Sequence, residues 1–187
     1  MPTITPYSGT VTPLARVFRP LAIGIAGVTL MTISAKVQIP FWPVPMTLHT
    51  MAVMAFALLL GPRMAVAIFA VYFAAGAAGL PVFAGSPARG LGLTYIAGPT
   101  GGYLVGYLLA SGVTGWLAVG RGWLGQTFAM LTGLGVVYGF GLIWLSAFVP
   151  SEQLMAVGVL PFLAGDLAKI AVVGLAAQGM ARLRGLK

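Results

Sequence analysis

Apolar residues form six long runs along the chain, separated by short segments that contain Pro, Gly or charged residues. Runs of about 20 apolar residues are typical of transmembrane helices. The pattern predicts an all-α membrane protein with one transmembrane domain over residues 1–187, whose first 20 residues form a cytoplasmic N-terminal segment. The six transmembrane helices are expected at about 21–37, 44–60, 64–80, 101–119, 124–148 and 156–180.

The second of these helices has the shortest apolar run, residues 47–60, which is short for a membrane crossing. It must either recruit residues 44–46 or cross a thin region of the bilayer. An arrangement with five spans and one re-entrant segment therefore remains open on hydropathy alone.

The distribution of positive charge favours six spans. With six crossings, one side of the membrane carries only two cationic residues, Lys36 and Arg89, and the other side carries seven. The seven are Arg16, Arg19, Arg63, Arg121, Arg182, Arg184 and Lys187. The positive-inside rule then predicts that both termini are cytoplasmic and that the connections at 36–47, 81–99 and 150–155 face outward.

Composition supports a multi-pass protein of the cell membrane and excludes several other classes. Charged residues make up 6% of the chain, hydrophobic residues make up 59%, and the mean hydropathy is +1.02, whereas soluble domains are about 25% charged. The net charge of +8 comes without a dense basic run, which argues against a nucleic-acid partner. With no Cys, one His and two acidic residues, the chain offers little for a metal site.

The strongest chemical signal is the sequence PFLAGDLAK at 161–169, which places Asp166 and Lys169 in the last apolar run. At this spacing the two side chains share one helix face. Charges at membrane depth are costly unless they are paired or face water, so such a pair marks a functional site by default. The alternative is a neutralised ion pair that only fixes helix packing.

Other candidates each allow two interpretations. His49 lies near the start of the second span. It is either a hydrogen-bonded helix-end residue or a ligand contact. Phe83 and Tyr95, in the outward connection 81–99, are either interfacial aromatics or part of a cover over a ligand. Ala22 and Ala26 form a small-x-x-x-small pair, suited to packing within the chain or against a partner subunit.

Four stretches, taken together, resemble the BioY family, the biotin-specific substrate-binding S components of energy-coupling factor (ECF) transporters. They are VPMTL at 44–48, GLPVFAG at 79–85, GPTGGYL at 98–104 and PFLAGDLAK at 161–169. At the position of His49, family members more often have Gln.

The resemblance implies a six-helix subunit that is not an enzyme and holds no cofactor. It would capture biotin from outside and work with a transmembrane coupling protein and two ABC-type ATPases, which use the ATP. Ala22 and Ala26 would contact the coupling protein. The candidate substrate-binding residues are Asp166, Lys169, Thr47, Phe83, Tyr95, Arg89 and His49.

Two other functions remain to be weighed against this one. A self-sufficient secondary carrier for a small anionic vitamin would also use a buried Asp, but proton relays usually involve several ionisable groups, and no other acid lies within a predicted span. A scaffold subunit without a ligand is the third possibility.

Overall fold

The computed structural model describes residues 13–185 and is all-α, as predicted. The long helices are α1 (Pro13–Lys36), α2 (His49–Ala77), α4 (Gly101–Ala118), α5 (Trp123–Leu145) and α7 (Leu160–Gly185). Shorter helical turns are α3 (Gly92–Ile96), η1 (Ser151–Gln153) and α6 (Leu154–Gly158). Two short strands, β1 (Gln38–Ile39) and β2 (Met46–Thr47), pair antiparallel between α1 and α2.

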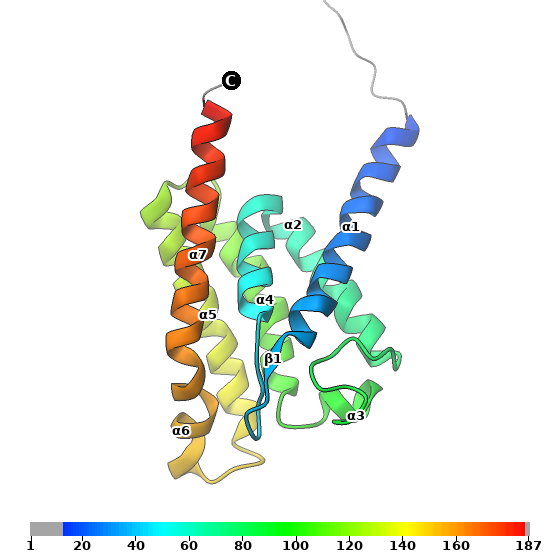
Figure 1. Ribbon diagram of the computed structural model, residues 1–187, viewed down its shortest axis with the longest axis vertical. Coiled ribbons are helices and arrows are strands. Elements are labelled where there is room, and N and C mark those ends of the chain that lie inside the picture. Colours follow the sequence, from blue (N-terminus) through cyan, green and yellow to red (C-terminus); the bar gives the residue numbers. More distant parts are fainter. Residues whose placement is uncertain (1–12, 186–187) are drawn as a thin grey trace, which may run out of the picture.

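Helix α2 is a hairpin of two arms that reverses direction at Gly61 (Figure 1). Gly61 has φ 79° and ψ 172°, a conformation that side chains with a Cβ rarely adopt. Pro62 follows it, and Pro is well suited to the first turn of a helix because it lacks the N–H that would be unbonded there. The pair Gly61-Pro62 therefore ends one arm and starts the next without an intervening loop.

The chain runs back and forth between two ends of the molecule (Figure 1). In that view α1 descends, the first arm of α2 rises and its second arm descends, α4 rises, α5 descends and α7 rises. Pro13 and Gly185, the first and last described residues, consequently lie at the same end. The strands, α3 and α6 lie at the other end.

The boundaries differ from the predicted ones where hydropathy carries no signal. The first helix begins at Pro13, so only residues 1–12 of the predicted N-terminal segment fall outside the described residues. Residues 44–48 contain strand β2 instead of helix, and the predicted helix 156–180 is divided between α6 and α7. The predicted helices 44–60 and 64–80 are the two arms of α2.

By length and hydropathy, three described segments meet the requirements of a membrane span: His49–Ala77, Trp123–Leu145 and Ser151–Leu183. Pro20–Lys36 is a shorter apolar helix. Because α2 reverses at Gly61, its first arm, residues 49–60, is only about 18 Å long at 1.5 Å per residue.

Helices α4 and α5 pack closely because glycines line their contact. A Cβ at Gly106 would lie 2.9 Å from the Cα of Val137, and one at Gly102 would collide with Trp144. Small residues of this kind allow helix backbones to approach within the membrane. This closely packed pair forms part of the wall of the candidate site, through Tyr103, Leu104 and Tyr107 of α4 and Tyr138 of α5.

Candidate ligand-binding site

Asp166 and Lys169 form a buried ion pair on one face of α7. The distance from Lys169 Nζ to Asp166 Oδ1 is 2.8 Å, and the two side chains are 11% and 6% exposed, respectively. Tyr138, on α5, donates a hydrogen bond of 2.8 Å to the other carboxylate oxygen, Oδ2. Both oxygens of Asp166 therefore have a partner, and the orientation of the carboxylate is fixed by two helices.

Lys169 also reaches across to the segment before α2. Its Nζ donates to the carbonyl oxygen of Thr47 at 2.6 Å. An ammonium group carries three N–H donors, and the bonds to Thr47 and Asp166 use two of them. Among residues 13–185 the third N–H has no partner, so it is available to a bound molecule.

The ion pair lies in a pocket lined by α4, α5 and α7 and by the segments that precede α2 and α4. The pocket encloses about 510 Å³ of space between atoms, including the part that is open to solvent. Its polar lining includes hydroxyl groups, an imidazole and the ion pair; these residues are Thr47, His49, Tyr95, Thr100, Tyr103, Tyr107, Tyr138, Asp166 and Lys169. The remaining lining residues are Val44, Pro45, Met46, Ala84, Leu104 and Phe162.

Two segments at this end of the molecule are joined by hydrogen bonds from the cationic side chains of Lys36 and Arg89. We call residues 37–48 the hairpin segment and residues 80–91 the covering loop. Lys36, next to the hairpin segment, donates at 2.9 Å to the carbonyl oxygens of Phe83 and Ser86 and to the Ser86 hydroxyl. Arg89 reaches back from the covering loop and donates to the carbonyl oxygens of Phe41 at 3.0 Å and Pro43 at 3.3 Å.

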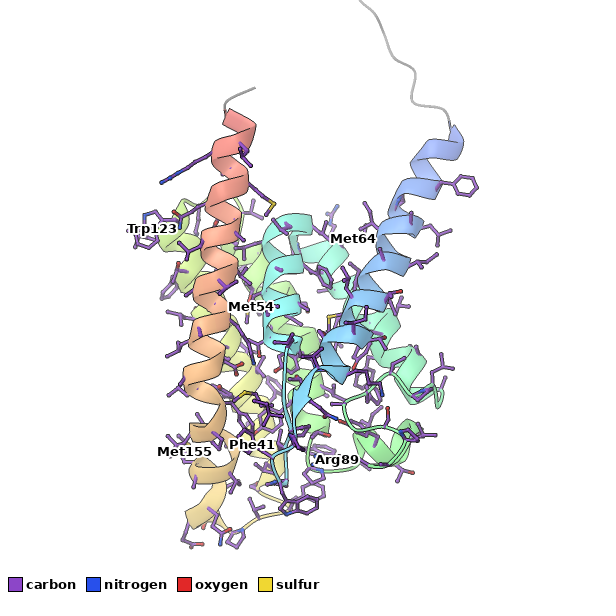
Figure 2. The ribbon with its side chains drawn as sticks, viewed as in Figure 1. Phe41, Met54, Met64, Arg89, Trp123 and Met155 are labelled. Atoms are coloured by element: carbon purple, nitrogen blue, oxygen red, sulfur yellow. The ribbon has the colours of Figure 1, made fainter. Side chains whose placement is uncertain are left out.

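These reciprocal hydrogen bonds of Lys36 and Arg89, which we call the clasp, join the two segments beside the pocket. Figure 2 shows Phe41 and Arg89 at the same end of the molecule, opposite Trp123. The Phe41 ring also packs edge-on against Phe162 of α7, with 6.1 Å between centroids. The hairpin segment is thereby connected both to the covering loop and to the helix that carries the ion pair.

Phe83 anchors the covering loop from behind the pocket wall. Its ring is 1% exposed and stacks on Tyr95 with 4.9 Å between centroids. A Cβ at Gly76 would collide with the Phe83 ring, so the second arm of α2 accommodates Phe83 only because residue 76 is Gly. Burial raises the pKa of the Tyr95 hydroxyl, and this outweighs the opposing influence of Thr100 and of the Arg89 charge.

The structure brings five of the seven predicted substrate-binding residues into one pocket wall: Asp166, Lys169, Thr47, His49 and Tyr95. Phe83 and Arg89 lie outside that wall and hold the segments around it. Ala22 and Ala26 are both exposed on α1, away from the pocket. Within residues 13–185, no three His, Cys, Asp or Glu side chains come together in a group that would hold a metal ion.

Tyr138 is the principal contact that sequence reasoning missed. It lies in the middle of an apolar run, where a hydroxyl group needs a hydrogen-bond partner. That requirement is a signal that the residue has a polar neighbour, but its identity depends on how α5 packs against α7.

Comparison with known proteins gives consistent matches over most of the chain. The BioY family model matches residues 9–185. A probable biotin transporter BioY of Pyrococcus horikoshii is 36% identical over 158 residues, which cover 84% of this chain and 91% of that protein. The biotin transporter BioY of Thermotoga maritima is also 36% identical, over 160 residues that cover 82% of this chain and 90% of that protein.

A solved structure has the same fold. The crystal structure of the S-component for biotin from an ECF-type ABC transporter superposes with a TM-score of 0.79 at 25% sequence identity. The match covers 91% of this chain and 94% of that one. These relatives are transporters, not enzymes.

Proposed function

Because the chain belongs to the BioY family, we propose that it is a high-affinity biotin-binding S component of a vitamin importer. The observation that carries the proposal is the Asp166–Lys169 pair, buried in a pocket on an apolar helix. A buried ion pair contributes little to stability compared with apolar residues of similar size. A role in ligand recognition accounts for its presence better than a role in packing.

The groups in the pocket suit the chemistry of biotin. Biotin has ureido N–H donors, a ureido oxygen, a carboxylate and an apolar bicyclic ring. Asp166 offers carboxylate lone pairs to N–H groups, and the remaining N–H of Lys169 suits either the carboxylate or the ureido oxygen. Leu104, Phe162 and the tyrosine rings provide the apolar and aromatic surface that a bicyclic ligand needs.

We further propose that an ATP-driven coupling module completes the importer. In this arrangement a transmembrane coupling protein contacts α1 through Ala22 and Ala26, and two ABC-type ATPases use the ATP. The likeness to the S-component of an ECF-type ABC transporter supports this assignment. The exposure of both alanines supports it as well, because small exposed residues allow a partner helix to approach closely.

The proposed membrane arrangement has six crossings, made by α1, the two arms of α2, α4, α5 and α7, with both termini in the cytoplasm. The common position of Pro13 and Gly185 supports an even number of crossings. The excess of Lys and Arg at that end supports its cytoplasmic location in the cell membrane. The first arm of α2 is too short for the full hydrocarbon core of about 30 Å, so the pocket at its outer end would lie below the outer membrane surface.

Ligand binding by the purified protein tests this proposal. We expect detergent-solubilised protein to bind biotin without an ion gradient, and to bind thiamin and riboflavin far more weakly. Replacing Asp166 or Lys169 with Ala is expected to weaken biotin binding by more than about tenfold, because each change leaves a buried charge unpaired. Full retention of binding in both variants would exclude this site.

Reconstitution separates the importer subunit from a secondary carrier. Liposomes that contain this chain alone should not exchange labelled biotin by counterflow. Addition of the coupling protein, the ATPases and ATP should produce uptake. Counterflow by the chain alone would favour the carrier.

A further inference from the structure

Both ring nitrogens of His49 are already bonded to the protein, although the ring lies in the pocket wall. The residue is 3% exposed. Its Nδ1 is 3.2 Å from the hydroxyl oxygen of Thr47, and its Nε2 is 2.9 Å from the hydroxyl oxygen of Tyr72. No N–H group or nitrogen lone pair of the imidazole remains for a ligand.

The partners of Tyr72 decide which nitrogen carries the proton. The Tyr72 hydroxyl lies 3.2 Å from the carbonyl oxygen of Val82, which can only accept, so donating its single proton there satisfies both groups. The Tyr72 oxygen must then accept from His49, which requires a proton on Nε2. In the neutral ring Nδ1 is an acceptor, and the Thr47 hydroxyl donates to it.

A neutral ring also fits the charges around it. A buried imidazolium would require a carboxylate partner. The only carboxylate in the pocket belongs to Asp166, which is bonded to Lys169 and Tyr138. His49 is instead surrounded by the rings of Phe69, Tyr72 and Tyr107.

These bonds link the ion pair to the covering loop. Lys169 donates to the carbonyl of Thr47, the Thr47 hydroxyl to His49, His49 to Tyr72, and Tyr72 to Val82. Val82 is followed in the sequence by Phe83 and then Ala84. The Phe83 ring stacks on Tyr95, and Ala84 lines the pocket. His49 therefore connects the Asp166–Lys169 ion pair to the covering loop.

We infer that His49 is a positioning residue for ligand retention and acts as the neutral Nε2–H tautomer. Through Tyr72 it holds the covering loop against the pocket. Through its Nδ1 it holds Thr47, whose carbonyl oxygen accepts a hydrogen bond from Lys169. The inference rests on the proposed function, because the retained ligand is biotin. It assigns His49 a role through its neighbours and no polar contact with the ligand.

The tautomer can be measured directly, because His49 is the only His in the chain. Protein labelled with ¹⁵N-histidine in detergent micelles gives one pair of ring nitrogens in a long-range ¹H–¹⁵N spectrum. We expect Nε2 protonated and Nδ1 unprotonated at neutral pH, with and without biotin. A proton on Nδ1, or on both nitrogens, would overturn the inference, whatever the outcome of biotin binding.

Variants test the effect on retention. His49→Leu removes the bonds to Thr47 and Tyr72, and Tyr72→Phe removes the bonds to His49 and Val82. We expect each to accelerate the release of labelled biotin by at least about fivefold, which is roughly the effect of losing one of these two hydrogen bonds. His49→Gln should remain within about twofold of the unmodified protein, because its amide offers the same acceptor and donor pair. Phe128→Leu, on the exposed face of α5, is the control for loss of an aromatic side chain.

Coupling between the two sites distinguishes a shared chain of bonds from separate effects. The double variant His49→Leu/Tyr72→Phe should release biotin no faster than the faster single variant. Release at the unmodified rate by His49→Leu, or additive effects in the double variant, would overturn the inference while the proposed function stands. If the unmodified protein binds no biotin, the proposed function itself fails.

Discussion

The Tyr138 hydroxyl is one of the two groups that hold the Asp166 carboxylate in place, together with the Lys169 ammonium. Tyr138→Phe removes the 2.8 Å bond to Asp166 Oδ2 and leaves the carboxylate to Lys169 alone. Hydrogen bonds to charged groups contribute about 1.5–3 kcal/mol, so we expect biotin affinity to fall by at least about tenfold. Isothermal titration calorimetry on the purified variant measures the change.

Thr132→Val is the control for Tyr138→Phe. It removes a hydroxyl from the same helix, but Thr132 bonds to the carbonyl of Phe128 outside the pocket wall. Its affinity for biotin should equal that of the unmodified protein. Equal affinity in Tyr138→Phe as well would mean that Lys169 alone orients the carboxylate.

At the scale of residues, the sequence identifies charged groups better than neutral ones. Asp166 and Lys169 are conspicuous in an apolar run, and their spacing already puts them on one face. Tyr138 and Tyr72 carry hydroxyl groups whose partners lie 28 and 23 residues away in the sequence. Such contacts depend on the register of helix packing, which hydropathy does not encode. For the same reason the two interpretations of His49 could not be separated without its neighbours.

At the scale of elements, the α4–α5 contact depends on the absence of side chains. Gly106→Ala would place a Cβ 2.9 Å from the Cα of Val137, so the helices must separate. Overpacking of this kind typically costs about 1–3 kcal/mol. We expect a lower melting temperature in detergent. Gly139→Ala, on α5, has no heavy atom within 4 Å of the new Cβ and should melt at or above the temperature of the unmodified protein.

A separate prediction concerns the clasp between the hairpin segment and the covering loop and its effect on the rate of biotin release. Lys36→Met removes the donor to Phe83 and Ser86 but keeps most of the side-chain length. Lys36 is exposed, which reduces the contribution of its charge. We expect biotin release to accelerate by about threefold to tenfold. Arg63→Met neutralises a cation at the other end of the molecule and should leave release unchanged; an equal effect there would point to net charge instead.

The elements themselves were predictable to different degrees. Gly61-Pro62 marks a break that both the sequence and the structure contain, because few other residue pairs permit so abrupt a reversal. The start of α2 was placed five residues too early, since Val44 to Leu48 are as apolar as a helix but form strand β2 and its flanks. Helix α3 was not predicted, because five residues within a Gly-rich connection have too short a pattern to detect.

At the scale of the whole molecule, the sequence locates the pocket through asymmetry. One end carries most of the cations, and the other carries the long connection 81–99 with the aromatic residues Phe83 and Tyr95. The structure adds that these connections are bonded to one another through main-chain carbonyls, with Lys36 and Arg89 as donors. No sequence pattern specifies such bonds, because a carbonyl acceptor is present at every residue.

The membrane arrangement can be tested one position at a time, because the chain contains no Cys and each introduced thiol is unique. Glu152, in η1, and Arg121, between α4 and α5, are exposed at opposite ends of α5. In intact cells a charged maleimide should label Glu152→Cys but not Arg121→Cys, which should react only after permeabilisation. Labelling of both from outside would mean that α5 does not cross the membrane.

The same assay decides between six crossings and a re-entrant α2. Arg63 follows the reversal at Gly61 and is exposed. If both arms of α2 cross, Arg63→Cys lies on the same side as Arg121→Cys and reacts as readily after permeabilisation. If α2 enters and leaves from the outer side, Arg63 remains within the bilayer, where a charged reagent does not reach it. We expect the first result, since an unpaired Arg is costly at membrane depth but favourable at the cytoplasmic surface.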